Sequence, residues 1–252
     1  AIVAGNGIGS GVMAIPYFVS KAGIAGGILA FLFAYVVSVL LHLMIAQILL
    51  HTGDTADILR AFHIYLFKGR FRNVLKIAFF VILVVVLETN LAAYISGAAE
   101  IVGTLFPAVP VIVFQIGFYI LAAVIVVLGL HAICISEKVT VSVMGGILLI
   151  ALIFSFLHIN PAAAGTFLQT GGFSCLMPFL AAYSMIIFSF SAIFAVPQVI
   201  EVLDRDEKKI RKAIFAGLLM NLIISVIVTV CTILTSAEVT KVAVVGWAKA
   251  VG

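Results

Sequence analysis

Long runs of apolar residues alternate with short polar segments along the chain. The clearest run covers residues 111–130, in which Gln115 and Tyr119 are the only appreciably polar side chains. A bilayer core about 30 Å thick requires about 20 apolar residues per helix. The runs that meet this requirement predict seven membrane spans, at residues 1–20, 24–50, 74–104, 111–130, 139–157, 176–200 and 213–235. Transmembrane β-strands alternate over about 10 residues, so the pattern predicts an all-α polytopic membrane protein instead.

The composition supports this fold class. The chain of 252 residues is 65% hydrophobic and 10% charged, whereas soluble domains are about 45–50% apolar and about 25% charged. This leaves too little polar surface for a water-soluble globule and argues against disorder and against a nucleic-acid partner. The three cysteines lack metal-ligand spacing, and we interpret them as small apolar packing residues: Cys134, Cys175 and Cys231.

The basic residues predict the orientation in the membrane. Eleven of the fourteen Lys and Arg residues fall in loops on one side of the predicted spans. Cytoplasmic loops carry the excess of positive charge. We therefore expect a multi-pass protein of the plasma (inner) membrane, with a cytoplasmic N-terminus and an extracytoplasmic end at Gly252.

The first predicted span contains an unusual glycine motif. Residues 5–11 read Gly5-Asn6-Gly7-Ile8-Gly9-Ser10-Gly11. Each glycine costs a helix roughly 1 kcal/mol relative to alanine. Within a membrane, unwound backbone persists only where it is buried in protein or lines a water-filled cavity. The motif therefore predicts a broken helix beside a binding site, in preference to a small-residue packing face.

The sixth predicted span contains a matching segment. Ser10-Gly11-Val12-Met13-Ala14-Ile15-Pro16 aligns without gaps to Ser191-Ala192-Ile193-Phe194-Ala195-Val196-Pro197. The two segments lie five spans apart, and an odd number of spans inverts the second copy in the membrane. Inverted repeats with broken helices in corresponding places are typical of secondary transporters of the leucine-transporter type.

This symmetry predicts the organisation of the chain. A first five-helix repeat would cover residues 1–158, an outer loop residues 159–175, and the start of a second, inverted repeat residues 176–252. Counterparts of spans three to five would then follow Gly252, so we expect the seven spans to be an incomplete set.

The motifs resemble a known superfamily. Gly7-Ile8-Gly9-Ser10-Gly11 followed by Ala14-Ile15-Pro16 is similar to the first helix of amino acid–polyamine–organocation transporters. The segment 188–197 with Glu201, and residues 238–247, resemble the amino acid/auxin permease and aromatic amino acid permease branch. The resemblance implies ten core helices in two inverted repeats of five.

The resemblance also implies a substrate site. The amides of Gly9, Ser10 and Gly11 would bind a substrate carboxylate. The ammonium group would contact backbone carbonyls from both broken helices: Asn6, Gly7, Phe188, Ser189 and Ser191. Phe190, Phe194 and residues of span three would shape the side-chain pocket.

Ionisable residues inside spans are candidates for function. Glu88 lies near the middle of span three, where it could relay a proton or bond to a neighbouring helix. It shares one helical face with Ala92, Ile95 and Ala99, and the roughly opposite face carries Asn90, Tyr94, Gly97 and Ile101. The sequence does not decide which face is turned to the substrate. Glu201, at the inner end of span six, could pair with a basic residue in an inner gate, and we interpret His42 as a hydrogen-bonded packing residue.

Three classes of function fit seven apolar spans. We expect an amino-acid transporter, a symporter driven by H⁺ or Na⁺ without any other cofactor. A seven-span sensor or receptor is the alternative, although span seven contains no lysine for a retinal Schiff base. A membrane-embedded enzyme is disfavoured because the chain contains neither an H-E-x-x-H nor a G-x-S-x-G motif. The expected partners are an amino acid substrate and the lipid bilayer, and neither a metal site nor an oligomeric state is predicted.

Overall fold

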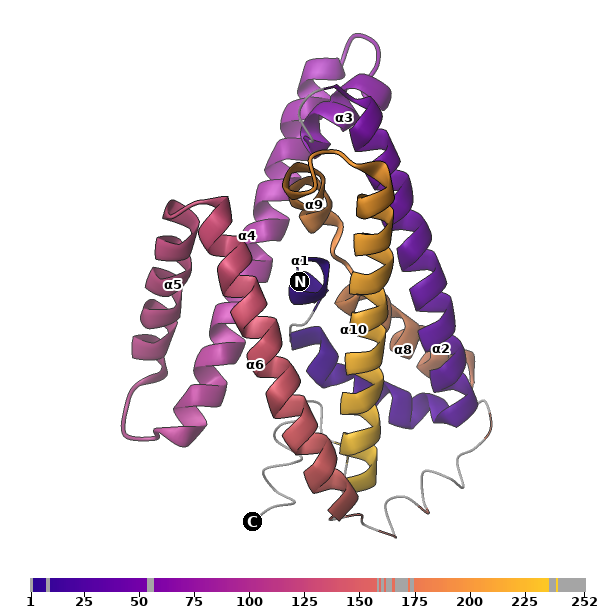
Figure 1. Cartoon of the computed structure of the whole chain (residues 1–252), viewed down its shortest axis with the longest axis vertical. Coiled ribbons are helices and arrows are strands. Elements are labelled where there is room, and N and C mark those ends of the chain that lie inside the picture. The colour runs from indigo at the N-terminus through magenta and orange to yellow at the C-terminus, as the bar shows by residue number, and fades with distance from the viewer. Residues whose placement is uncertain are drawn as a thin grey trace. The chain divides into compact units, whose positions relative to one another are not determined.

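The computed structural model describes residues 2–7, 10–53, 57–157, 159, 161, 165, 172, 175–235 and 239. All regular structure in these residues is helical, which confirms the all-α prediction (Figure 1). The elements are α1 (Ile2–Gly7), α2 (Ser10–His51), α3 (Ile58–Tyr65), α4 (Arg72–Leu105), α5 (Val111–Val127), α6 (Leu130–Leu157), α8 (Leu176–Ser189), η1 (Ile193–Ala195), α9 (Val196–Val202) and α10 (Glu207–Thr235).

The predicted spans can be compared with the helices of the structure. Among the described residues, five helices are long and apolar enough to cross a membrane: Gly11–His51, Arg72–Glu100, Leu130–Ser155, Leu176–Val202 and Glu207–Thr235. The first of these contains two helices that meet at the non-helical residue Gly23 (φ 78°, ψ 170°), which lies between the first two predicted spans. Predicted span 111–130 corresponds to α5, a shorter apolar helix of 17 residues. The chain is thus a polytopic membrane protein.

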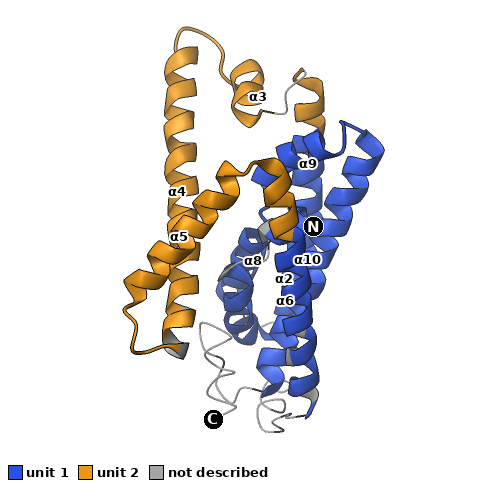
Figure 2. Ribbon diagram, turned by 60° about the vertical axis from the view of Figure 1, so that its left-hand side comes forward, with its two compact units in different colours: residues 1–46, 138–252 blue, residues 47–137 orange. Residues whose placement is uncertain are grey.

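The chain folds as two compact units (Figure 2). Unit 1 comprises residues 1–46 and 138–252, and unit 2 comprises residues 47–137. Both segments with predicted helix breaks belong to unit 1. The two units are defined by packing contacts and do not test the predicted internal symmetry. The repeat boundaries at residues 158 and 176 therefore stay a prediction.

In unit 1, the short helix α1 packs against α10, α9 and η1. Asn221 on α10 is fully buried, and its Nδ2 donates a hydrogen bond to the backbone carbonyl of Val3 at 3.4 Å. The same side of α10 buries Ile214, Leu218 and Val228. Asn221 is thus a buried polar side chain of α10 whose hydrogen-bond partner is the backbone of α1.

In unit 2, α4 packs against α5 and α3. Asp57 caps α3, since its Oδ1 accepts a hydrogen bond from the backbone amide of Leu59 at 2.8 Å. The ring of Phe62 on α3 stacks on that of Phe79 on α4, with their centroids 4.3 Å apart. The polar stretch between the second and third predicted spans therefore contains a short helix held by aromatic packing.

Candidate functional site

A break in the helix of predicted span six forms one half of the candidate site. Helix α8 ends at Ser189, and α9 begins at Val196, with Pro197 in its first turn. Between them the backbone makes tight turns: the amide of Ser191 donates to the carbonyl of Phe188 at 3.1 Å. The break therefore lies within residues 188–197, where the sequence predicts it.

The second predicted break, at the glycine motif, lies partly outside the described residues. Helix α1 ends at Gly7 and α2 begins at Ser10. Ile8 and Gly9 lie outside the described residues, as do the side chains of Asn6 and Ser10. The proposed cradle for a carboxylate, which depends on the Gly9, Ser10 and Gly11 amides, stays a prediction.

The start of α2 meets the end of α8 at Gly11. A β-carbon at this position would lie 3.3 Å from Cδ1 of Phe188 and 3.3 Å from Cβ of Ser189. These contacts are shorter than ordinary van der Waals contacts, so a larger side chain would require Phe188 or Ser189 to shift. The absent side chain of Gly11 is thus what allows the start of α2 to approach the end of α8.

The predicted binding residues of the α8 break differ in their exposure. Phe190 is fully buried and Ser189 is nearly so, whereas Phe188 is 47% exposed. Ser191 is exposed and Phe194 is half-buried. Phe188, Ser191 and Phe194 are consequently the members of this segment that offer side-chain surface to a ligand.

His42 contacts this break directly: the prediction of a hydrogen-bonded packing residue is confirmed, but its partner in the break is not predicted from the sequence. Its ring is buried in α2, and its Nε2 accepts a hydrogen bond from the backbone amide of Ala192 at 3.0 Å. Its Nδ1 lies 2.6 Å from the carbonyl oxygen of Ser38. In the sequence, His42 is an ionisable side chain inside an apolar run. This observation does not identify its partner Ala192, which lies 150 residues away.

Glu88 lies in unit 2, beside a cavity of about 320 Å³ between α4 and α5. Ser96, Gln115 and Tyr119 add polar groups to the lining, and Leu91, Ala92, Ile95 and Ile116 complete it. The structure therefore turns the Glu88 face of α4 toward α5, whereas Asn90 and Tyr94 are not part of this lining. The role of Glu88 in coupling stays a prediction.

Glu201 lies near the end of α9 and is exposed. The tight turn that follows carries Asp204 and Arg205 at positive φ, 49° and 60°. Ion pairs in this region join Lys209 to Asp206 and Arg211 to Glu207. The predicted pairing of Glu201 with a basic residue in an inner gate stays a prediction.

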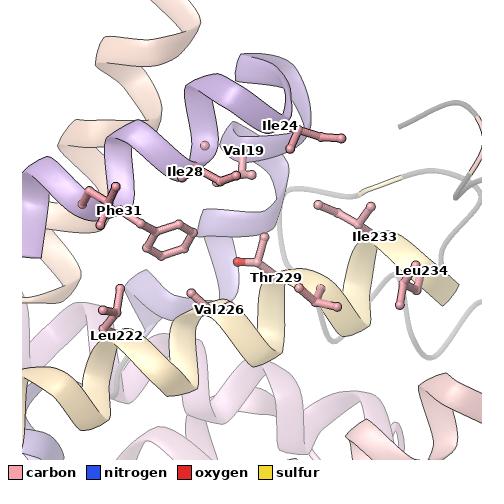
Figure 3. Close-up of a pocket in the computed structure, with 12 residues that line it drawn as sticks. Val19, Ile24, Ile28, Phe31, Leu222, Val226, Thr229, Ile233 and Leu234 are labelled. Atoms are coloured by element: carbon pink, nitrogen blue, oxygen red, sulfur yellow. The ribbon is translucent and has the colours of Figure 1, made fainter. Parts of the chain in front are cut away.

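A larger cavity of about 530 Å³ lies between α2 and α10 but does not fit a polar ligand (Figure 3). Val19, Ile28 and Phe31 line one side, and Leu222, Val226 and Ile233 line the other. Thr229 is the one polar residue of the lining, and its hydroxyl donates to the carbonyl of Ser225 at 2.7 Å. Charged groups are costly to bury without partners, so a zwitterion would not bind here.

Comparison with known proteins identifies a family. The family model described as the tryptophan/tyrosine permease family matches residues 1–247. No curated protein and no solved structure matches the chain. Within the part of the chain that the structure describes, no three His, Cys, Asp or Glu residues form a group that could hold a metal ion.

Proposed function

The chain belongs to the tryptophan/tyrosine permease family, and from this premise we propose that it transports an aromatic amino acid by secondary active symport with H⁺ or Na⁺. That the protein is an amino acid permease of the membrane follows from the family and from its apolar helices. The substrate, the coupling ion and the mechanism of alternating access are the proposed parts.

One observation carries the location of the site: the close approach of Gly11 to Phe188 and Ser189. It brings the start of α2 beside the interruption between α8 and α9, and backbone amides and carbonyls at interrupted helices are suited to the two charged ends of an amino acid. The carboxylate would bind the amides of residues 9–11, and the ammonium group would bind carbonyls of residues 6–7 and of the α8 break. A neutral apolar compound would leave these polar groups without partners.

The side chains at the break favour an aromatic substrate. Phe188 is exposed and Phe194 is half-buried, so both could contact a substrate ring. Offset or edge-to-face contacts between aromatic rings contribute about 0.5–1.5 kcal/mol beyond the burial of apolar area. Phe190, which is fully buried, would support the break from behind.

Coupling and gating would involve the carboxylates outside this segment. Glu88 would exchange a proton through the polar cavity between α4 and α5, and Glu201 would contribute to a cytoplasmic gate. This arrangement assumes the orientation that the basic loops predict, with the N-terminus in the cytoplasm of a plasma-membrane protein. The alternative of a seven-span sensor gains no support from the family or from the helix count.

Uptake into proteoliposomes tests the proposal. Radiolabelled tryptophan and tyrosine would be offered with an imposed pH gradient, with a Na⁺ gradient, and with neither. We expect accumulation with one of the two gradients and competition by unlabelled aromatic amino acids but not by lysine. The proposal is wrong if leucine and lysine compete as well as tryptophan does, or if uptake only equilibrates whichever gradient is imposed.

The matched variants are Phe188→Leu and Phe188→Tyr. Leucine removes the ring and should raise the KM for tryptophan, whereas tyrosine keeps the ring and should leave the KM close to that of the unaltered protein. Equal KM values in both variants would remove Phe188 from the substrate pocket.

A further inference from the structure

The imidazole of His42 joins predicted span two to the break between α8 and α9. It is buried, with 1% of its surface exposed, in an otherwise apolar stretch of α2. Its two nitrogens have different partners: Nδ1 lies 2.6 Å from the carbonyl of Ser38, and Nε2 lies 3.0 Å from the amide nitrogen of Ala192. All three residues belong to unit 1.

These partners fix the state of the ring. A backbone carbonyl only accepts hydrogen bonds and a backbone amide only donates them. Nδ1 therefore carries the proton that it donates to Ser38, and Nε2 accepts from Ala192. The ring is neutral, because a protonated Nε2 would oppose the Ala192 N–H with a second donor.

The Ala192 amide does not make the hydrogen bond of a continuous helix. In such a helix it would donate to the carbonyl of Phe188, which here accepts from Ser191 at 3.1 Å. Within the break, the Ala192 amide is shared between Nε2 of His42 and the carbonyl of Phe190, which is two residues back and 2.9 Å away in a tight turn. A side-chain acceptor is what an interrupted helix needs at membrane depth, where unsatisfied backbone groups are costly.

We propose that His42 is a positioning residue for the substrate site: it holds the break by accepting the hydrogen bond of Ala192 and so fixes Ser189 and Ser191. Ser191 is adjacent to Ala192, and Ser189 is the residue that faces Gly11. His42 itself is buried and would act through these neighbours without touching the substrate. The proposal rests on the proposed function for its effect on transport, but the hydrogen bond is independent of any substrate.

The test compares a side chain at position 42 whose hydrogen-bond acceptor reaches the amide of Ala192 with a side chain that has no acceptor. His42→Gln can place its amide oxygen near the former Nε2 position, whereas His42→Leu fills similar space without an acceptor. Ser38→Ala, one turn away on the same buried face, keeps the backbone carbonyl and is the matched control. The transport readout is the KM and Vmax for tryptophan, and the structural readout is hydrogen–deuterium exchange of residues 188–196 in detergent.

We expect His42→Leu to raise the KM at least tenfold with a smaller change in Vmax, and to speed exchange in residues 188–196. His42→Gln and Ser38→Ala should both resemble the unaltered protein in KM and in exchange. If His42→Leu does not fold, His42→Asn replaces it, because its shorter side chain does not reach Ala192. Equal impairment by Gln and by Leu would overturn the proposal, as would normal exchange and KM in the variant without an acceptor.

The two readouts separate this proposal from the proposed function. If the unaltered protein transports no aromatic amino acid but the exchange pattern is as expected, the proposed function fails and the role of His42 in the break stands. If transport is as proposed but exchange is unchanged in His42→Leu, only the role of His42 fails.

Discussion

Gly217 on α10 lies so close to Val3 on α1 that a β-carbon at position 217 would lie 2.5 Å from the β-carbon of Val3. The same β-carbon would lie 3.4 Å from the backbone nitrogen of Ala4. The shorter distance is well below ordinary contact, so the small residue is what permits this packing. Asn221, one turn further along α10, then reaches the carbonyl of Val3.

Gly217→Ala should therefore destabilise unit 1. Inserting one methyl group into a tightly packed contact costs about 1–3 kcal/mol, although alanine alone is the better helix former. The measurement is the thermal denaturation midpoint of the purified protein in detergent, which should fall. Gly117→Ala in α5 is the control, because a β-carbon there meets nothing within 4 Å. A midpoint that does not fall in Gly217→Ala would contradict the close packing of α1 on α10.

Gly11→Val should abolish transport without preventing membrane insertion. Its β-carbon would already lie 3.3 Å from Phe188 and Ser189, and the two further methyl groups would force the two breaks apart. Gly11→Ala adds less volume and should retain part of the activity. Uptake of labelled tryptophan is normalised to the amount of protein in the membrane, with Gly117→Val as the control for a β-branched residue in a helix. Normal uptake by a well-expressed Gly11→Val protein would contradict the proposed site.

The break between α8 and α9 could be predicted from the sequence because it has a local cause: Pro197 lacks the amide that would continue the helix through the break. Glycines at alternate positions disfavour a helix through backbone entropy, and the break that they predict at residues 5–11 lies partly outside the described residues. The apolar runs likewise predict most of the helices, since their length is set by the bilayer.

The partners of the breaks could not be predicted, because they depend on tertiary packing. The contact of His42 with Ala192 joins residues 150 positions apart. The contact of Asn221 with Val3 joins residues 218 positions apart. The orientation of Glu88 could not be predicted from the sequence either, because both faces of its helix are apolar enough to pack against a neighbouring helix. The sharp change of direction within α2 depends on Gly23, whose positive φ is non-helical and separates the first two predicted spans.

The start of α10 should respond to pH through Asp206. Its carboxylate accepts hydrogen bonds from the backbone amides of Lys208 at 3.1 Å and Lys209 at 3.2 Å, and it pairs with the Lys209 ammonium group at 3.3 Å. The hydrogen bonds from Lys209, with its charge and the amide of Lys208, lower the pKa of Asp206. The folded state therefore favours the carboxylate.

Because the pKa of Asp206 is lowered in the folded state, the effect of pH on the stability of the protein has a defined sign. The contribution of Asp206 to stability is fully present above the unfolded pKa, about 3.9, and is lost as the pH falls through the folded value. Asp206→Asn keeps an acceptor for the helix start but should remove this part of the pH dependence, whereas Asp206→Ala should lower the denaturation midpoint at neutral pH as well. Denaturation midpoints measured in detergent between pH 7 and pH 3 test both expectations. A pH dependence in Asp206→Asn equal to that of the unaltered protein would exclude Asp206 as its source.

Glu88→Gln should uncouple transport from the proton gradient. A neutral amide cannot bind and release a proton, but it can keep the hydrogen bonds that a carboxyl group makes, so the α4–α5 cavity with Gln115 and Tyr119 should persist. Accumulation of tryptophan driven by an imposed pH gradient should fall to the level seen without a gradient, whereas exchange of internal for external tryptophan should continue. Glu100→Gln, an exposed carboxylate on the same helix, is the matched control and should keep both activities. If Glu88→Gln accumulates tryptophan against its gradient as the unaltered protein does, Glu88 has no part in coupling, and the cavity beside it serves only the packing of α4 on α5.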